Sequence, residues 1–564
     1  MNQNDALAQA YLFFQHGKFD AAHALLQPLA QARNADVPLL QLAAATAAAL
    51  GSHGDAINWF RRALAAAPGD VAISYKLARV LVDVGQPQEA LGIYLELMVA
   101  GVEHADVYRA AAMLLQQFQR DPEALQTIQK ALQLAPQAAD SWYLQAVLQA
   151  RLQQLPQAVH SLQQAIQLSP GQAQYHLDLA LALHGMHHDT QALSAIDQAL
   201  ALDARQSASW NARAAILSRL SRYDEAIACG KRALLLKPAD PESSVNLAFN
   251  LLTLGQMEPA WPLYESRWQG ALADPLRHQQ LPRWSGAQAL AGKTILLWSE
   301  QGLGDTVQFC RYALEVAASG AQVVLEVPLS LCSLLRTLVM HDASLARDAI
   351  SVIALGEALP PIDYQLPLLS LPLVYRTELH SIPAPHAYLC SDPQKQAHWA
   401  EVVGSGAGLR IGVVCSGNAG NRKDGLRSLP LATLAPLFES IDADFYLLQP
   451  ELREDDHAYL QNAPAVHWPG RHLQAFDDTA ALIANLDLVI SVDTAVAHLA
   501  GAMGVPIWIM LSEAADWRWF RDRSDSPWYR SARLFRQAQA GAWAPLAEQL
   551  KLALLGGLRP ESAS

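Results

Sequence analysis

Small apolar residues recur along the first half of the chain at a fixed interval of 34 positions. The main series consists of alanines: Ala22, Ala56, Ala90, Ala124, Ala158, Ala192, Ala226 and Ala260. A second series is in phase with it: Ala63, Leu97, Ala131, Ala165, Ala199 and Ala233. A strict interval of this length is typical of a repeated pair of helices that stack side by side. The pattern therefore predicts an all-α solenoid over residues 1–270, with about seven to eight repeats.

Glycine and proline mark the same period. Gly17, Gly51, Gly85 and Gly255 each stand five residues before a periodic alanine, and Pro68, Pro136, Pro170 and Pro238 fall at repeat ends. Glycine permits the turn inside each helix pair, and proline separates one repeat from the next because it cannot continue a helix. With these residues in phase, the region resembles the tetratricopeptide-repeat family. The periodic residues are packing and turn positions, and we assign them no chemistry.

The hydrophobic pattern changes after residue 270. Residues 271–291 contain several turn residues and are interpreted as a junction. Short apolar runs then predict buried parallel strands over residues 294–298, 321–327, 409–415, 444–448, 486–492 and 505–511. Helical stretches alternate with these runs, so we expect two doubly wound lobes, 292–400 and 401–555, and a tail, 556–564. Such sheets bind ligands at the carboxyl ends of their strands, which predicts a cleft between the lobes.

Composition narrows the classes of function. The formal net charge of −13 disfavours bulk binding of nucleic acid, which needs a basic surface. No apolar run reaches about 18 residues, so no membrane span is expected, and the first residues lack the features of a signal peptide. The five cysteines form no CxxC pair, which argues against a zinc site and a disulfide framework. A cytoplasmic location fits these features best.

The segment 491–504 is the most informative part of the second half. Asp493 and Thr494 end a predicted strand and begin a predicted helix. Backbone N–H groups and the positive end of the helix dipole would bind a diphosphate there. His498 would either reach the cleft or pack beneath it. Taken alone, the pattern more often marks a capping aspartate together with a buried structural histidine than a ligand site.

Three pieces of sequence in a fixed order suggest a family. They are Gly304-Asp305 after the first strand, Ser416-Gly417-Asn418 with the polar stretch 421–428, and the segment 493–502. Together they cover about residues 290–540 and resemble the ADP-heptose:lipopolysaccharide heptosyltransferases, which are GT-B transferases of nucleotide-activated sugars. One position departs from that family. Ala495 stands where the family often has glycine, and its Cβ would crowd a phosphate close to the backbone.

The resemblance implies roles for the matched residues. Asp305 would be the general base for the acceptor hydroxyl, or the cap of the following helix, and the two roles are compatible. Lys423 and Arg427 would neutralise the leaving diphosphate, so that no metal or other cofactor is expected. Further donor-binding candidates are Ser416, Gly417, Asn418, Gln449, Glu451, Asp493, Thr494, Ala495 and His498. Gln301, Gly304 and Arg518 are candidates for the rim of the cleft, although the segment around Arg518 would equally suit packing between the lobes.

The favoured hypothesis is a metal-independent GT-B glycosyltransferase whose donor is a nucleotide sugar. The repeats would hold a protein or peptide acceptor, with flagellin or another surface protein among the candidates. One alternative is a transferase with a glycan or lipopolysaccharide acceptor. The other is a non-catalytic tetratricopeptide scaffold with a decayed transferase domain, for which Ala495 is the main indication. The sugar, the nucleotide and the oligomeric state stay open, including a homo-oligomer.

Overall fold

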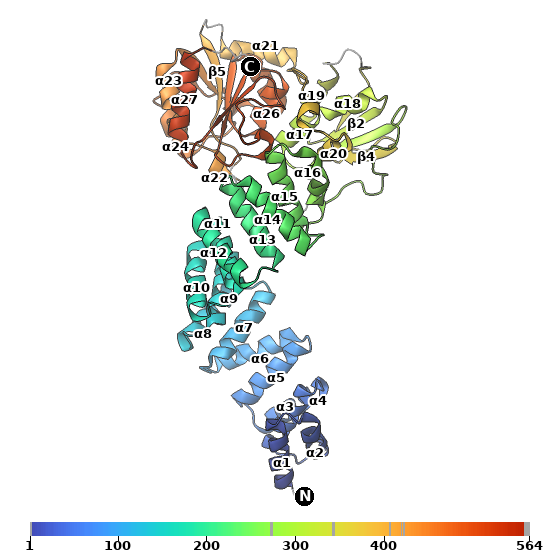
Figure 1. The fold of residues 1–564 in the computed structure, drawn as a ribbon, viewed down its shortest axis with the longest axis vertical. Helices are drawn as coiled ribbons and strands as arrows, with labels where there is room; N and C mark the ends of the chain where they lie inside the picture. The colour runs from blue at the N-terminus through green and yellow to red at the C-terminus, as the bar shows by residue number, and fades with distance from the viewer. Residues whose placement is uncertain are drawn as a thin grey trace. The chain divides into compact units, whose positions relative to one another are not determined.

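The computed structural model describes residues 3–270, 275–340, 345–404, 408–418, 420 and 424–557. The chain forms two compact units, Met1–Arg205 and Gln206–Ser564. The first unit is helical, and the second combines helices with parallel sheets (Figure 1). The predicted fold class, a solenoid followed by a two-lobed α/β region, is confirmed. The predicted domain boundaries stay predictions, and residues 271–274 of the junction and 558–564 of the tail lie outside the described residues.

The first unit consists of helices in consecutive pairs, each pair joined by a short turn. The helices are α1 (Gln3–Gln15), α2 (Phe19–Gln31), α3 (Val37–Ala49), α4 (His53–Ala66), α5 (Val71–Asp83), α6 (Pro87–Val99), α7 (Ala105–Gln117), α8 (Asp121–Leu134), α9 (Ala139–Arg151), α10 (Leu155–Leu168), α11 (Ala173–Gly185) and α12 (Asp189–Leu202). Every periodic alanine of this unit lies on the second helix of its pair and is fully buried. The small side chain therefore recurs where helices pack most closely.

The second unit begins with two more helix pairs of the same kind. They are α13 (Ser207–Arg219), α14 (Tyr223–Leu236), α15 (Pro241–Thr253) and α16 (Met257–Tyr264), followed by the 3₁₀ turn η1 (Glu265–Trp268). Ala226 and Ala260 are again fully buried on the second helices. The described residues thus contain eight helix pairs, and the last two share a compact unit with the α/β lobes.

The first α/β lobe contains a four-stranded parallel sheet. Its strands are β1 (Thr294–Trp298), β2 (Gln322–Val327), β3 (Ile350–Ala354) and β4 (Tyr364–Pro367), in the order β3-β2-β1-β4. Its helices are α17 (Leu303–Phe309), α18 (Tyr312–Ala318), α19 (Leu329–Leu335) and α20 (Leu371–Val374). The order reverses direction between β1 and β4. In open α/β sheets such a switch point leaves a crevice at the carboxyl ends of the two strands.

The second lobe contains a six-stranded parallel sheet with the doubly wound order β10-β9-β8-β5-β6-β7. The strands are β5 (Leu409–Val414), β6 (Ala443–Leu447), β7 (Val466–His467), β8 (Leu488–Val492), β9 (Ile507–Leu511) and β10 (Ala532–Arg536). The helices are α21 (Pro393–Val403), α22 (Asp424–Arg427), α23 (Ala435–Ser440), α24 (Glu454–Leu460), α25 (Phe476–Ile483), α26 (Ala495–Ala502) and α27 (Trp543–Leu555). The switch point of this sheet lies between β5 and β8.

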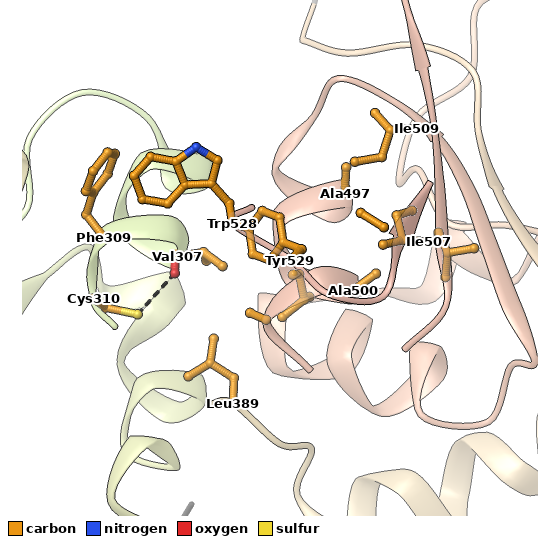
Figure 2. Packing of buried hydrophobic residues seen from close by; sticks show 14 of the residues in the cluster. Val307, Phe309, Cys310, Leu389, Ala497, Ala500, Ile507, Ile509, Trp528 and Tyr529 are labelled. Atoms are coloured by element: carbon orange, nitrogen blue, oxygen red, sulfur yellow. Dashed lines mark hydrogen bonds between the residues drawn. The ribbon is translucent and has the colours of Figure 1, made fainter. Parts of the chain in front are cut away.

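The two lobes pack against each other through α17 and α26. Figure 2 shows apolar side chains of α17, such as Val307 and Phe309, near Trp528 and Tyr529 of the second lobe. At the start of α17 there is no room for a side chain, because a Cβ on Gly304 would lie 2.8 Å from Cδ2 of His498. The lobes are therefore in direct contact at the first turns of these two helices.

Arg311 joins the lobes from a fully buried position. Its guanidinium donates to the carbonyl oxygen of Trp528 at 2.5 Å, to that of Pro383 at 3.1 Å and to the hydroxyl of Tyr388 at 2.8 Å. It also lies 4.7 Å from the ring centroid of Tyr529. Carbonyl dipoles and aromatic faces thus stabilise this buried cation across the lobe contact.

Two expectations from composition can be compared with the structure. All five cysteines have free thiols in the structure. Among the described helices, none combines the length and hydropathy that a membrane crossing requires.

The repeat packing predicts a contrast between two alanines of α4. Ala56 is fully buried, whereas Ala65 on the same helix is exposed. Ala56→Leu should destabilise the first unit by about 1–3 kcal/mol, because the added methylenes have no space. Ala65→Leu is the matched control and should change stability by less than about 0.5 kcal/mol. Thermal unfolding followed by circular dichroism measures both, and equal melting curves for the two variants would contradict the packing described.

Candidate functional site

The switch point of the second sheet, where open α/β sheets have a crevice at the carboxyl ends of their strands, brings two predicted segments together. Cys415–Asn418 follow β5, and Asp493 and Thr494 follow β8. The Arg427 guanidinium bridges them, because its Nη1 donates to the carbonyl oxygen of Asp493 at 2.8 Å. A Cβ on Gly417 would collide with the same guanidinium, so any other residue at that position would displace Arg427. A cation therefore lies across the crevice between β5 and β8.

Asp424 fixes the position of this cation. Its buried carboxylate accepts hydrogen bonds from the Ser428 hydroxyl at 2.8 Å and from Arg453 at 2.5 Å, and it lies 3.5 Å from Nε of Arg427. The Ser428 hydroxyl in turn accepts from the backbone N–H of Gly417 at 3.0 Å. The loop after β5 and the start of α22 are thus one hydrogen-bonded network. Lys423 lies outside the described residues.

Gln449, two residues after the end of β6, forms its side-chain hydrogen bonds within the second lobe. Its amide oxygen accepts from the backbone N–H of Cys415 at 3.0 Å, and its amide nitrogen donates to the Ser416 hydroxyl at 3.0 Å. It therefore holds the ends of β5 and β6 in register. Glu451 is exposed two residues later, and the side chain of Asn418 accepts from the N–H of Gly420 at 2.8 Å.

The first turn of α26 faces the same crevice. Its N-cap residue, Thr494, has extended backbone angles, and its side chain makes no capping hydrogen bond. The hydroxyl lies 3.1 Å from that of Ser491 instead. Backbone N–H groups at the start of α26, beginning with Ala495, are therefore left for a ligand. An anion placed there would also experience the positive end of the helix dipole.

Asp493 is a carboxyl group with unusual electrostatics. Burial raises its pKa to about 6, and the nearby carboxylate of Asp516 acts in the same direction. Arg427 and Arg518 oppose that rise in the pKa. The carboxyl group therefore changes protonation close to physiological pH.

His498 is the fourth residue of α26, and its side chain is packed in the interior. Its ring is buried, stacks on Trp519 at a centroid distance of 5.1 Å, and places Nδ1 2.8 Å from the Tyr529 hydroxyl. Burial, with a further contribution from Arg518, lowers its pKa to about 3. The imidazole is consequently neutral at physiological pH, and its edge contacts the first lobe at Gly304.

Asp305 lies at the start of α17 with both carboxylate oxygens engaged. One oxygen accepts from the backbone N–H of Gly302 at 2.8 Å, and the other accepts from Nη2 of Arg518 at 2.5 Å. Burial raises the pKa of Asp305, while Arg518 opposes that rise. Arg518 also donates to Gln308 and to Asp516, each at 2.8 Å. The aspartate caps the helix, and one buried guanidinium joins it to the second lobe.

The corresponding crevice of the first sheet is filled by the chain itself. Arg267, in the turn after the last repeat, makes two hydrogen bonds of 2.8 and 2.9 Å to Glu300, which follows β1. It also donates to the hydroxyl of Ser370, after β4, at 2.9 Å. The side chains of Arg267 and Glu300 are 7% and 2% exposed. This pair was not predicted from the sequence, although a glutamate directly after a buried strand indicates a polar group at the carboxyl edge of the sheet.

The junction segment also covers this edge of the first sheet. Arg277 donates to Glu326, at the end of β2, at 2.9 Å, and Nε2 of His278 lies 2.8 Å from the same carboxylate. Arg283 pairs with Gln365 of β4 as a parallel bridge. Among the described residues, no group of three or more histidine, cysteine, aspartate or glutamate side chains is arranged to hold a metal ion.

Comparison with protein families agrees with both halves of the architecture. Models of the tetratricopeptide repeat match residues 7–71, 47–114 and 190–244. The model described as glycosyltransferase family 9 (heptosyltransferase) matches residues 474–516. That segment contains Asp493, the whole of α26 and Asp516.

Similar proteins were found among relatives and solved structures. Protein FlbA of Caulobacter vibrioides is 31% identical over 370 residues, and the match covers 62% of this chain and 61% of FlbA. The solved MamA protein is 20% identical, covering 30% of this chain and 92% of MamA, with a TM-score of 0.29. The C-terminal part of a tetratricopeptide-repeat protein from Cytophaga hutchinsonii is 15% identical, covering 43% of this chain and 99% of its own, with a TM-score of 0.37.

The raised pKa of Asp493 predicts a pH-dependent stability. The folded chain holds this proton up to about pH 6, whereas the ordinary value is 3.8. The associated stabilisation is complete below the ordinary value and is lost as the pH rises through 6. Asp493→Asn, which stays neutral, should therefore gain about 1–3 kcal/mol over the wild type at pH 7.5 and about a third of that at pH 4.5.

Melting temperatures of the variant and the wild type at these two pH values measure the effect. The difference in melting temperature between the variant and the wild type is compared at the two pH values. Groups that titrate in both proteins, such as His498, cancel in this difference. Asp442→Asn, at an exposed position of the same lobe, is the control and should show no such change. A difference that is the same at both pH values would show that Asp493 does not titrate as described.

Proposed function

We propose that this chain, which joins tetratricopeptide repeats to a glycosyltransferase family 9 region, transfers a sugar from a nucleotide-sugar donor to a protein acceptor. The crevice between the ends of β5 and β8 carries this proposal. It combines unused N–H groups at the start of α26 with the guanidinium of Arg427, and these groups suit a diphosphate. The family 9 match includes the β8–α26 side of that crevice.

The reaction follows from where the charged groups lie. The donor diphosphate would occupy the start of α26, with Arg427 as its cation and no metal required. A base removes the proton of the acceptor hydroxyl, the oxygen bonds to the anomeric carbon, and the bond to the diphosphate breaks. Asp305 is the proposed base. It is held by Arg518 in this structure, so the arriving diphosphate would draw this guanidinium away and release the carboxylate.

Two observations favour a protein acceptor over a glycan acceptor. The switch point of the first sheet, where open α/β sheets commonly bind a small ligand, is filled by Arg267, Glu300 and Ser370. The repeats offer an extended surface of the kind that binds polypeptides. A flagellin or another surface protein remains a candidate acceptor, and a cytoplasmic location remains a prediction.

Donor binding is tested by thermal stabilisation with a panel of nucleotide sugars. A ligand at 100 times its dissociation constant stabilises the folded state by about 2.7 kcal/mol. We expect one diphosphate donor class to raise the melting temperature, and Arg427→Ala to lose most of this rise. Arg410→Ala is the matched control, because Arg410 pairs with Asp487 at the opposite end of β5. If no nucleotide sugar stabilises the wild type at millimolar concentration, the chain is a scaffold instead.

Asp305→Asn separates binding from chemistry. Asparagine retains the ability to cap α17 but cannot accept a proton. Release of nucleoside diphosphate from the stabilising donor should therefore fall by about 10²–10⁴-fold, while the donor still raises the melting temperature. A variant that keeps its full turnover would exclude Asp305 as the base.

A further inference from the structure

The last repeat helix ends against the loop that precedes Asp305. Tyr264, the final residue of α16, is 2% exposed. Its hydroxyl accepts a hydrogen bond of 3.1 Å from the side-chain amide of Gln301. Tyr264 belongs to a repeat, whereas Gln301 belongs to the loop between β1 and α17. The contact therefore joins the solenoid directly to the predicted catalytic loop.

Gln301 has a backbone conformation that a side chain disfavours. Its φ of +58° lies in the left-handed region, which glycine adopts readily and glutamine does not. The hydrogen bond to Tyr264 anchors the side chain in this conformation. A side chain in this region costs free energy, which contacts with the surrounding structure have to offset.

The conformation of Gln301 determines where Asp305 points. The peptide after Gln301 carries the N–H of Gly302, which donates to the Asp305 carboxylate at 2.8 Å. If Gln301 left the left-handed region, this N–H would turn and the carboxylate would lose one of its two protein partners. The other partner, Arg518, lies beside Trp517, with its guanidinium 4.4 Å from that ring centroid.

Tyr264 is held rigidly enough to act as such an anchor. The guanidinium of Arg267 lies 4.6 Å from its ring centroid. The rings of Trp261 and Trp517 pack edge-on at centroid distances of 6.3 and 6.4 Å. Burial raises the pKa of Tyr264 to about 12, so the hydroxyl keeps its proton.

We propose that Tyr264 is a positioning residue for the transfer reaction, which holds Gln301 in its left-handed conformation and thereby orients Asp305. The final tetratricopeptide repeat is then part of the transferase site as well as of the acceptor surface. This inference rests on the proposed function, because Asp305 is the base only if the chain is a transferase.

Tyr264→Phe removes only the hydroxyl and tests the proposal. With the nucleotide sugar that stabilises the chain, kcat for release of nucleoside diphosphate should fall about tenfold, the effect of one lost hydrogen bond. The KM for the donor should stay within about twofold of the wild type, because the donor crevice is unchanged. Tyr175→Phe is the matched control, since the hydroxyl of this buried tyrosine of the first unit also hydrogen-bonds a side chain, in this case by donating to Asp140 at 2.8 Å.

Gln301→Gly provides the second variant, because glycine adopts the left-handed region without an anchor. In the Gln301→Gly background, Tyr264→Phe should change kcat by less than about twofold, so the two substitutions are strongly non-additive. Hydrogen exchange of residues 299–306 gives a readout that needs no donor. Tyr264→Phe should accelerate this exchange in the wild-type background and leave it unchanged in the Gln301→Gly background.

The outcomes separate the two proposals. A wild-type chain that binds no nucleotide sugar refutes the proposed function, and the positioning role fails with it. A wild-type chain that binds and turns over a donor, with Tyr264→Phe equally active, refutes the positioning role alone. Additive effects of Tyr264→Phe and Gln301→Gly on kcat would also overturn it.

Discussion

Helices α17 and α26 approach each other so closely that only glycine fits at residue 304, and the geometry of the candidate site depends on this contact. The missing side chain lets the first turn of α17 lie on His498 and Ala495. Asp305 and Asp493, at the starts of the two helices, consequently lie near the same guanidinium, that of Arg518. Arg311 also stabilises this contact, because its guanidinium donates to the carbonyl oxygen of Trp528 and lies over the ring of Tyr529. Removing a partner from such a buried charge network typically costs about 3–5 kcal/mol.

The two doubly wound sheets use their switch points differently. In the second lobe, Arg427 spans the crevice from within the lobe and leaves the N–H groups of α26 available. In the first lobe, Arg267 enters from the end of the repeats and closes the crevice with Glu300 and Ser370. The end of the repeats is therefore built into the first lobe. This arrangement explains why the last two helix pairs share a compact unit with the sheets.

Much of the fold could be predicted because its signals are local. The alanine period placed Ala22, Ala158 and their equivalents on buried helix faces, and apolar runs located β1, β2, β5, β6, β8 and β9. Strands β3, β4, β7 and β10 were missed, since they are short or carry polar residues that obscure the run. The donor-side segments at 416 and 493 were expected to meet, and Arg427 does connect them. The pairs Arg518–Asp305 and Arg267–Glu300 escaped prediction, because their partners are remote in sequence and have no periodic signal.

The central claim is that the crevice between β5 and β8 binds the diphosphate of a nucleotide sugar. Hydrogen exchange of the full chain, with and without saturating nucleoside diphosphate, tests it most directly. The account predicts slower exchange in residues 415–418 and 493–500, where backbone N–H groups would contact the phosphates. Protection confined to the repeat helices α1–α12, or no protection in residues 493–500, would contradict it.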